Sequence, residues 1–222
     1  MSPLGAVLFD MDGLLVDTEP VWTVAEIELA GRLGGLFTDE LKATIVGTRL
    51  EAAVTTFLTW YAAPSGPDAV AATSRWLLDR MVQLFGEGVT PMPGAVDLLA
   101  ALRAAGVPVA LVSSSYRVLV DAVLATGLGP FDVTVAGDEV VGGKPDPEPY
   151  LRACDRLGVR PSQAVVLEDS PAGVRSGERA GCAVVAVPSV VGVRFEPAPG
   201  RLVRSSLVGL TLRDLAALVE CG

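Results

Sequence analysis

Two aspartates, Asp10 and Asp12, come directly after the apolar run of residues 5–9, with only Met11 between them. Two carboxylates this close repel each other, so ending a buried strand in them is unfavourable unless a cation balances their charge. Paired carboxylates can also divide catalytic work, one acting as a nucleophile and the other as a general acid or base. What these two residues do therefore depends on the polar groups that the fold brings beside them.

Three further apolar runs also lead into polar side chains. These runs are residues 108–112, residues 131–137 and residues 164–168. The polar residues that end or follow them are Ser113, Ser114, Ser115, Lys144, Glu168, Asp169 and Ser170. If the runs are parallel strands, their carboxyl ends meet at one edge of a sheet, which is where such sheets bind ligands.

Each of these residues also has an ordinary structural interpretation. A serine after a strand is most often the N-cap of the next helix, as Ser114 or Ser115 could be, and as Ser170 before Pro171 could be. Lys144 could lie on the surface, where most lysines are. Four segments converging on one sheet edge nevertheless favour a site over coincidence.

The residue types indicate phosphoryl transfer. Several acids cannot crowd together in ionised form without a cation, and oxygen ligands without histidine or cysteine favour a hard one, Mg²⁺. Lys144, the serines and backbone N–H groups at a helix start could hold phosphate oxygens. One carboxylate could then attack phosphorus while a second transfers the proton.

The elements needed to position these groups follow from periodicity. After residue 92, apolar runs alternate with helical patterns, which predicts a parallel sheet covered on both faces. Residues 18–86 are helical in pattern, with a capping-box spacing at Thr48 and Glu51 before residues 52–61. We therefore predict an α/β core of residues 1–16 and 91–222, interrupted by a helical insertion of residues 17–90.

Composition excludes several classes of function. The chain has no histidine, which removes Ser-His-Asp catalysis and histidine-based zinc sites. A net charge of −9 without a basic cluster argues against nucleic-acid binding. No apolar segment approaches the ~20 residues of a membrane span, and the first ten residues lack the basic region of a signal peptide. The scattered cysteines Cys154, Cys182 and Cys221 suit a reducing compartment, so we expect a cytoplasmic protein.

Four motifs in order resemble those of the haloacid dehalogenase-like superfamily, over nearly the whole chain. They are FDMDGLLVDTEP, LVSSS, GGKPDPEPY and VVLEDSPAG. The resemblance implies a Rossmann-like parallel sheet core with an inserted helical cap domain, which closes over the substrate and excludes water. It also implies Mg²⁺ as the cofactor.

The resemblance further implies a role for each motif residue. Asp10 is similar to the nucleophile, which is also a Mg²⁺ ligand, and Asp12 to the general acid/base, whose backbone carbonyl also binds the metal. Ser113 and the amide of Ser114 are expected to hold the transferred phosphoryl group. Lys144 is expected to neutralise the nucleophile and the phosphate.

The fourth motif and the predicted cap supply the remaining candidates. Asp169 is expected to complete the metal site, with Glu168 reaching the metal through a bound water. In the cap, the position of Gly47, Thr48 and Arg49 resembles a substrate-specificity loop. Arg49 is equally well interpreted as a solvated residue at the start of a helix.

Within the superfamily, the first motif is similar to that of β-phosphoglucomutases and small sugar-phosphate phosphatases. The mutases carry a histidine at the position of Trp22, and the absence of that histidine here favours hydrolysis. Asp12 argues against carbon–halogen cleavage. The leading hypothesis is a monomeric, Mg²⁺-dependent phosphatase of a small phosphorylated metabolite, a sugar or polyol phosphate. The alternatives are a phosphomutase and a non-catalytic binding protein on the same fold.

A different phosphate-binding signature also occurs in the sequence. Cys154 and Arg160 match C-x5-R, the phosphate loop of cysteine phosphatases. That loop needs a strand before the cysteine and a helix after it, whereas Cys154 lies inside a helical pattern. We therefore predict that Cys154 is a structural residue of a helix.

Overall fold

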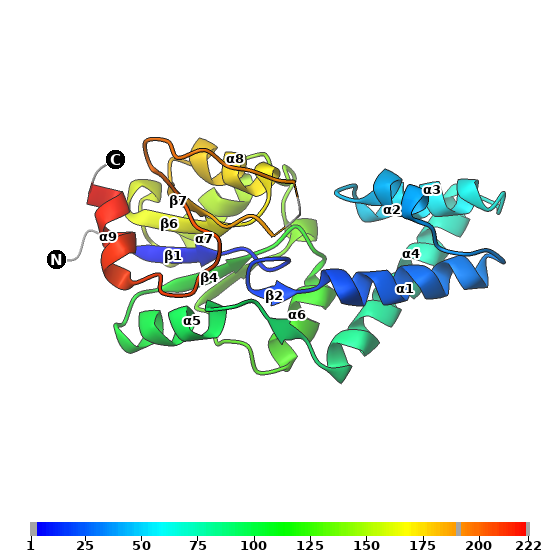
Figure 1. The fold of residues 1–222 in the computed structure, drawn as a ribbon, viewed down its shortest axis with the longest axis horizontal. Helices are drawn as coiled ribbons and strands as arrows, with labels where there is room; N and C mark the ends of the chain where they lie inside the picture. The colour runs from blue at the N-terminus through cyan, green and yellow to red at the C-terminus, as the bar shows by residue number, and fades with distance from the viewer. Residues whose placement is uncertain (1–3, 190–191, 221–222) are drawn as a thin grey trace. The chain divides into compact units, whose positions relative to one another are not determined.

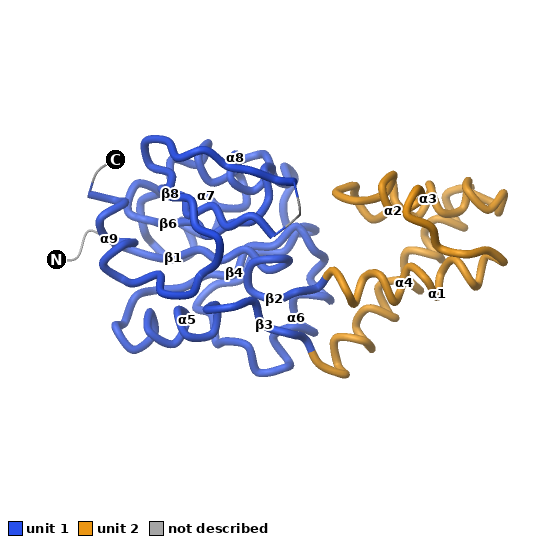
Figure 2. The backbone as a smooth tube through the Cα atoms, in the orientation of Figure 1, with its two compact units in different colours: residues 1–18, 89–222 blue, residues 19–88 orange. Residues whose placement is uncertain are grey.

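The computed structural model of the protein describes residues 4–189 and 192–220. The backbone divides into two compact units, with the boundaries between Thr18 and Glu19 and between Gly88 and Val89 (Figure 2). Unit 1 holds both ends of the described chain, and unit 2 is the segment inserted between them. The boundaries predicted from the sequence, after residues 16 and 90, lie within two residues of these positions. Cys221 lies outside the described residues.

Unit 1 is built on one sheet, which has six strands within the described residues, in the order β5-β4-β1-β6-β7-β8 (Figure 1). Every neighbouring pair is parallel. The strands are β1 Ala6–Phe9, β4 Val109–Val112, β5 Val133–Val135, β6 Ala164–Glu168, β7 Ala183–Ala186 and β8 Arg201–Val203. The central strands β1, β4 and β6 are buried along their whole length, as expected when helices cover both faces. The predicted α/β class is confirmed.

Helices pack against the sheet from both sides. The helices of unit 1 are α5 Ala95–Ala104, α6 Arg117–Ala125, α7 Glu148–Leu157, α8 Pro171–Arg179 and α9 Leu212–Glu220, with 3-10 turns η1 Gly137–Glu139 and η2 Pro161–Gln163. Helices α7 and α8 bury apolar side chains with one face of the sheet in a single core cluster. Helices α5 and α9 contact β4 and β6 but add no side chain to that cluster, so they cover the opposite face. Cys154 is a buried residue of α7, as predicted.

A short antiparallel ladder lies where the chain leaves and re-enters unit 1. Strand β2, Val16–Asp17, pairs with β3, Thr90–Pro91, with Asp17 opposite Thr90. The ladder therefore holds the two ends of the insertion side by side.

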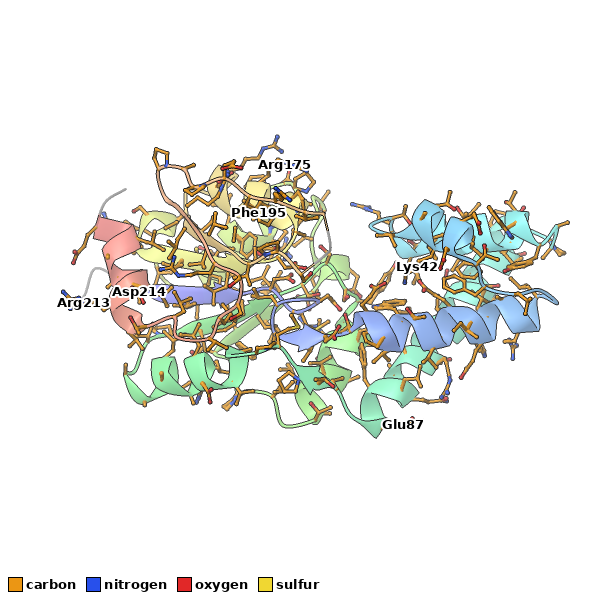
Figure 3. The ribbon with its side chains drawn as sticks, viewed as in Figure 1. Lys42, Glu87, Arg175, Phe195, Arg213 and Asp214 are labelled. Atoms are coloured by element: carbon orange, nitrogen blue, oxygen red, sulfur yellow. The ribbon has the colours of Figure 1, made fainter. Side chains whose placement is uncertain are left out.

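Unit 2 is helical throughout its regular structure. It contains α1 Glu19–Arg32, α2 Asp39–Ile45, α3 Leu50–Trp60 and α4 Pro67–Glu87. Helix α4 packs against α1 and α3, and α2 packs against α3. Lys42, which Figure 3 labels among these helices, forms ion pairs with Glu19 and the buried Glu26 of α1.

Helix starts follow the sequence-based predictions only in part. Ser170 is the N-cap of α8, with its side chain accepting from the Gly173 N–H, as predicted. The prediction of a capping box at Thr48 is wrong. Helix α3 has Arg49 at its N-cap, and the Thr48 hydroxyl donates to the carbonyl of Ile45. Among the described residues, no helix is long and apolar enough to cross a membrane.

Candidate active site

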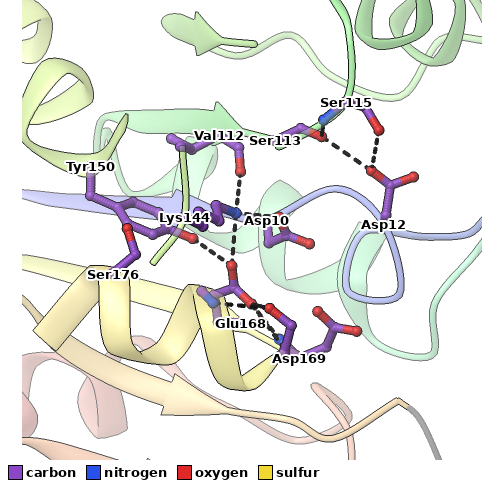
Figure 4. Close-up of polar contacts among 12 residues, drawn as sticks. Asp10, Asp12, Val112, Ser113, Ser115, Lys144, Tyr150, Glu168, Asp169 and Ser176 are labelled. Carbon is purple, nitrogen blue, oxygen red and sulfur yellow. Dashed lines mark hydrogen bonds and ion pairs between the residues drawn. The ribbon is translucent and has the colours of Figure 1, made fainter. Parts of the chain in front are cut away.

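Three neighbouring strands place the candidate residues at one edge of the sheet. Asp10 follows β1, Ser113 follows β4, and Glu168 is the last residue of β6. Because β1 pairs with both β4 and β6, the carboxyl ends of these three strands meet. Figure 4 shows the resulting cluster, into which Lys144 enters from the segment between η1 and α7.

Lys144 links the nucleophile candidate to the end of β6. Its Nζ donates to Asp10 Oδ1 at 2.5 Å, to Glu168 Oε1 at 2.7 Å and to the backbone carbonyl of Val112 at 2.8 Å (Figure 4). A lysine ammonium has three N–H donors, so these acceptors use all of them. Among the described residues, Asp10 Oδ2 has no hydrogen-bond donor, which leaves that oxygen available to react.

Glu168 is fully buried and accepts five hydrogen bonds. Its Oε1 accepts from Lys144 and from the hydroxyl of Tyr150, and its Oε2 accepts from Asp169 N, Ser170 N and Ser170 Oγ. The carboxylate is therefore occupied within the protein, and its contact with Lys144 ties the lysine to the end of β6.

Asp169 is held by a residue from the end of the next strand. The Ser189 hydroxyl, just beyond β7, donates to Asp169 Oδ2. Gly13, with a φ of 81°, passes so close that a Cβ there would lie 2.4 Å from the same carboxylate oxygen and 2.7 Å from Ser189 Oγ. A glycine is therefore required at position 13 both by its conformation and by the approach of the metal-site candidate.

Asp12 accepts hydrogen bonds from three hydroxyl groups. Thr18 Oγ1 donates to its Oδ1 at 2.8 Å, while Ser113 Oγ and Ser115 Oγ donate to its Oδ2 at 3.1 and 2.8 Å. Ser115 is therefore part of the site and not a helix N-cap, since Tyr116 is the N-cap of α6. Ser114 is exposed, and no hydrogen bond within the described residues uses its N–H.

Burial and like charges shape the electrostatics of the cluster. Burial raises the pKa of Asp10 well above its ordinary value, and the Lys144 ammonium opposes only part of this shift. Burial, reinforced by the charge of Glu168, raises the pKa of Asp169 to about 7. Burial alone would lower the pKa of Lys144, but Asp10 and Glu168 outweigh it and raise that pKa, so the lysine stays charged.

The acidic cluster fits a divalent cation. Ligand oxygens of Asp10, Glu168 and Asp169 lie within 4.8 Å of one another, and all three residues are buried. When ionised, the three carboxylates carry three negative charges against one positive charge on Lys144, which leaves two for a cation to balance. The raised pKa values of Asp10 and Asp169 indicate that the carboxylates are unfavourably charged without it.

The predicted cap residues lie in unit 2. Gly47, Thr48 and Arg49 are exposed and form the connection between α2 and α3. Trp22 is a half-buried residue of α1. Their parts in substrate binding and in the choice between hydrolysis and mutase chemistry stay predictions.

Three residues of the cluster are absent from the site predicted from the sequence. Ser189 could have been found by the rule that found the others, because it follows the apolar run of β7. Ser115 follows a strand, but the sequence alone is equally consistent with a helix cap at this position. Tyr150 carries no local signal, since its contact with Glu168 joins residues 18 positions apart across the core.

Comparisons with known proteins agree on one family. A model described as haloacid dehalogenase-like hydrolase matches residues 4–181. Hexitol phosphatase A of Escherichia coli K12 is 40% identical over 181 residues, 81% of each chain. A phosphorylated carbohydrates phosphatase of Thermotoga maritima is 33% identical over 178 residues, 79% of this chain and 81% of that protein. The crystal structure of CbbY from Rhodobacter sphaeroides with phosphate superposes with a TM-score of 0.84 at 31% identity, covering 96% and 99% of the two chains.

Proposed function

We propose that this chain, which belongs to the haloacid dehalogenase-like hydrolase family, hydrolyses phosphate monoesters of sugars or polyols. The observation that carries the proposal is the state of Asp10, with Oδ1 bound to Lys144 and Oδ2 without a donor among the described residues. A carboxylate fixed through one oxygen, with the other oxygen free, is arranged to attack phosphorus.

The reaction follows from the residues around Asp10. Asp10 Oδ2 attacks phosphorus and forms an aspartyl phosphate as the bond from phosphorus to the ester oxygen breaks. Asp12 gives its proton to that departing oxygen. Asp12 then takes a proton from a water molecule, whose oxygen attacks phosphorus, releases inorganic phosphate and restores Asp10.

Lys144 and the motif serines would stabilise charge during both steps. The Lys144 ammonium, bound to Asp10 Oδ1, balances the nucleophile and the negative charge near it. The unused N–H of Ser114 and the hydroxyl of Ser113 are suited to hold oxygens of the phosphoryl group. For Ser113, this requires its hydroxyl to turn from Asp12, which the contact length of 3.1 Å makes inexpensive.

The carboxylates of Asp10 and Asp169 and the backbone carbonyl of Asp12 would hold Mg²⁺. When bound, Mg²⁺ supplies positive charge that draws the phosphoryl oxygens into the site. Glu168 would reach it only through water, because its own oxygens already accept five hydrogen bonds.

The substrate class follows from the relatives and from unit 2. Two relatives are described as phosphatases of hexitols and of phosphorylated carbohydrates, which supports a sugar or polyol phosphate here. Residues 19–88 would act as the cap, with Gly47, Thr48 and Arg49 contacting the substrate. Trp22 at the position of the mutase histidine supports hydrolysis. We further infer a monomer that works in the cytoplasm.

The test is phosphate release from a panel of sugar and polyol phosphates and p-nitrophenyl phosphate, with and without chelator. We expect Mg²⁺-dependent release that Asp10→Asn lowers by a factor of about 10³ or more, because the nucleophile is lost. Asp155→Asn, an exposed aspartate on α7, is the matched control and should keep full activity.

Two results would contradict the proposal. Release that is indifferent to chelator and to Asp10→Asn would exclude the assigned site. Conversion of β-glucose 1-phosphate to glucose 6-phosphate without phosphate release would favour the mutase instead. Mass spectrometry of rapidly quenched reactions should find phosphate on the peptide that contains Asp10.

A further inference from the structure

Tyr150 lies beneath the catalytic lysine, on the side of the sheet covered by α7. It is 0% exposed and is among the largest fully buried side chains of unit 1. Its hydroxyl donates to Glu168 Oε1 at 2.9 Å, the same oxygen that accepts from Lys144 at 2.7 Å. Its ring centroid lies 5.0 Å from Lys144 Nζ, within the range of a cation–π contact. Figure 4 shows the three side chains together.

We propose that Tyr150 is a positioning residue, which acts through Glu168 to hold the Lys144 ammonium on Asp10. The expected effect on kcat rests on the proposed function. The expected effect on the position of the Lys144 ammonium rests on geometry alone. Its polar contacts within the described residues are with Glu168 and Lys144, so we assign it a positioning role and not a catalytic one.

The physical basis is competition between two carboxylates for one ammonium. Lys144 lies between Asp10 and Glu168, at 2.5 and 2.7 Å. In a buried site, a carboxylate oxygen short of donors attracts an ammonium strongly. The Tyr150 hydroxyl supplies Glu168 Oε1 with a second hydrogen-bond donor. Glu168 therefore attracts the Lys144 ammonium less strongly.

The other end of Glu168 is fixed as well. Oε2 accepts from two backbone N–H groups and one hydroxyl at the start of α8, which sets the plane of the carboxylate. Without the tyrosine hydroxyl, Oε1 would have Lys144 as its one donor among the described residues. We therefore expect the ammonium to move toward Glu168 and its contact with Asp10 to loosen.

Tyr150→Phe removes the hydroxyl and keeps the ring, so it isolates the hydrogen bond. We expect kcat for the best phosphate ester to fall about tenfold, with KM unchanged within about twofold, as is typical when a partner of a site residue is lost. The matched control is Tyr61→Phe, which removes a 2.7 Å hydrogen bond to the Leu36 carbonyl in unit 2 and should leave kcat unchanged.

A second readout does not depend on activity. The chain has only two lysines, Lys42 and Lys144, so ¹⁵N-lysine labelling gives two side-chain signals, which Lys42→Arg assigns. An ammonium held by three acceptors exchanges its protons slowly. We expect the Lys144 signal to shift and to exchange faster in Tyr150→Phe, and to be unchanged in Tyr61→Phe.

The outcomes separate the two proposals. Hydrolysis by the wild type with an unchanged kcat and an unchanged Lys144 signal in Tyr150→Phe would overturn the role of Tyr150 and leave the proposed function standing. No hydrolysis by the wild type, with an altered Lys144 signal in the variant, would overturn the function and keep the positioning contact. If Tyr150→Phe does not fold, Glu168→Gln tests the same competition in the opposite direction. Removing the charge of Glu168 should strengthen the contact of Lys144 with Asp10 and shift the Lys144 signal, and an unchanged signal would overturn the proposal.

Discussion

Asp169 is expected to make the stability of the metal-free protein depend on pH. Burial and the charge of Glu168 raise its pKa to about 7, against an ordinary value near 3.8 that holds when the chain is unfolded. Between these two values the folded state keeps a proton that the unfolded state has lost. Stability from this group is therefore present below about pH 4 and is lost as the pH rises toward 7.

This gives a prediction for thermal unfolding measured by calorimetry. In chelator, the Tm of the wild type should fall between pH 5 and pH 8. The fall should be smaller in Asp169→Asn, because that substitution removes the titrating group. Added Mg²⁺ should raise Tm more at pH 8 than at pH 5, since protons compete with the cation for Asp169 and Asp10. An equal effect of Mg²⁺ at both pH values would show that these carboxylates do not bind it.

At the same scale, the sequence predicts the acids better than their partners. Asp10 and Asp169 could be located because charged residues directly after apolar strands are unusual, and Lys144 because it lies in the segment that follows the next strand end. Ser115 could not be separated from a helix cap, because its partner Asp12 lies 103 positions away in the chain. Hydrogen bonds of that kind depend on strand order, which local sequence does not specify.

Helix α8 begins against the carboxylate of Glu168, and Gly173 makes this possible. A Cβ at Gly173 would lie 1.6 Å from Glu168 Oε1 and 1.8 Å from Cδ. The helix can therefore pack its first turn against Glu168 only if position 173 has no side chain. Ser170, the N-cap of this helix, donates to the same carboxylate.

We predict that Gly173→Ala lowers the free energy of unfolding by about 2 kcal/mol, because it overpacks a buried charged group. It should also reduce kcat, since Glu168 can no longer hold Lys144. Gly86→Ala in α4 is the control, as a Cβ there would meet nothing within 4 Å and alanine favours a helix by up to about 1 kcal/mol. Urea unfolding of the three proteins measures the difference, and equal destabilisation by both substitutions would exclude the contact with Glu168.

The longer helices and strands could be predicted from the periodicity of apolar residues, and the two-residue strands could not. Strands β1, β4 and β6 are built on apolar runs, and β4 and β6 lie between helical patterns, so their existence and type were predictable. Strands β2 and β3 have two residues each, too few for any periodicity. Their pairing arises from the two crossings between the units, not from their own side chains.

At the scale of the whole molecule, the chain is an α/β core interrupted once. The four sequence motifs predicted the family because each falls on a strand end or the segment that follows it, and the family match over residues 4–181 confirms it. The identity of the substrate could not be predicted in the same way, since in the proposed function it depends on the surface of unit 2, which no motif describes.

The ladder between β2 and β3 should allow unit 2 to be removed. Asp17 and Thr90 are opposite one another, and paired residues of antiparallel strands lie about 5 Å apart. We predict that replacing residues 19–88 with an Asn-Gly turn gives a core that unfolds cooperatively and binds Mg²⁺, because such a turn closes a hairpin. Its hydrolysis of sugar phosphates should fall well below that of the whole chain, since water is no longer excluded.

Calorimetry and phosphate release check this prediction, with Asp169→Asn in the shortened chain as the control for Mg²⁺ binding. A shortened chain without a cooperative transition would show that unit 1 depends on unit 2. Full activity toward sugar phosphates would show that unit 2 is not the cap.

The three acceptors around Lys144 also bear on the speed of turnover. Asp10, Glu168 and the Val112 carbonyl orient the ammonium as soon as the chain has folded. In water, solvent dipoles would have to reorient around the changing phosphate charge at every cycle, whereas in the proposed reaction the ammonium is already oriented toward Asp10. The barrier of the proposed reaction should therefore contain little reorganisation of this group, because folding has already arranged it.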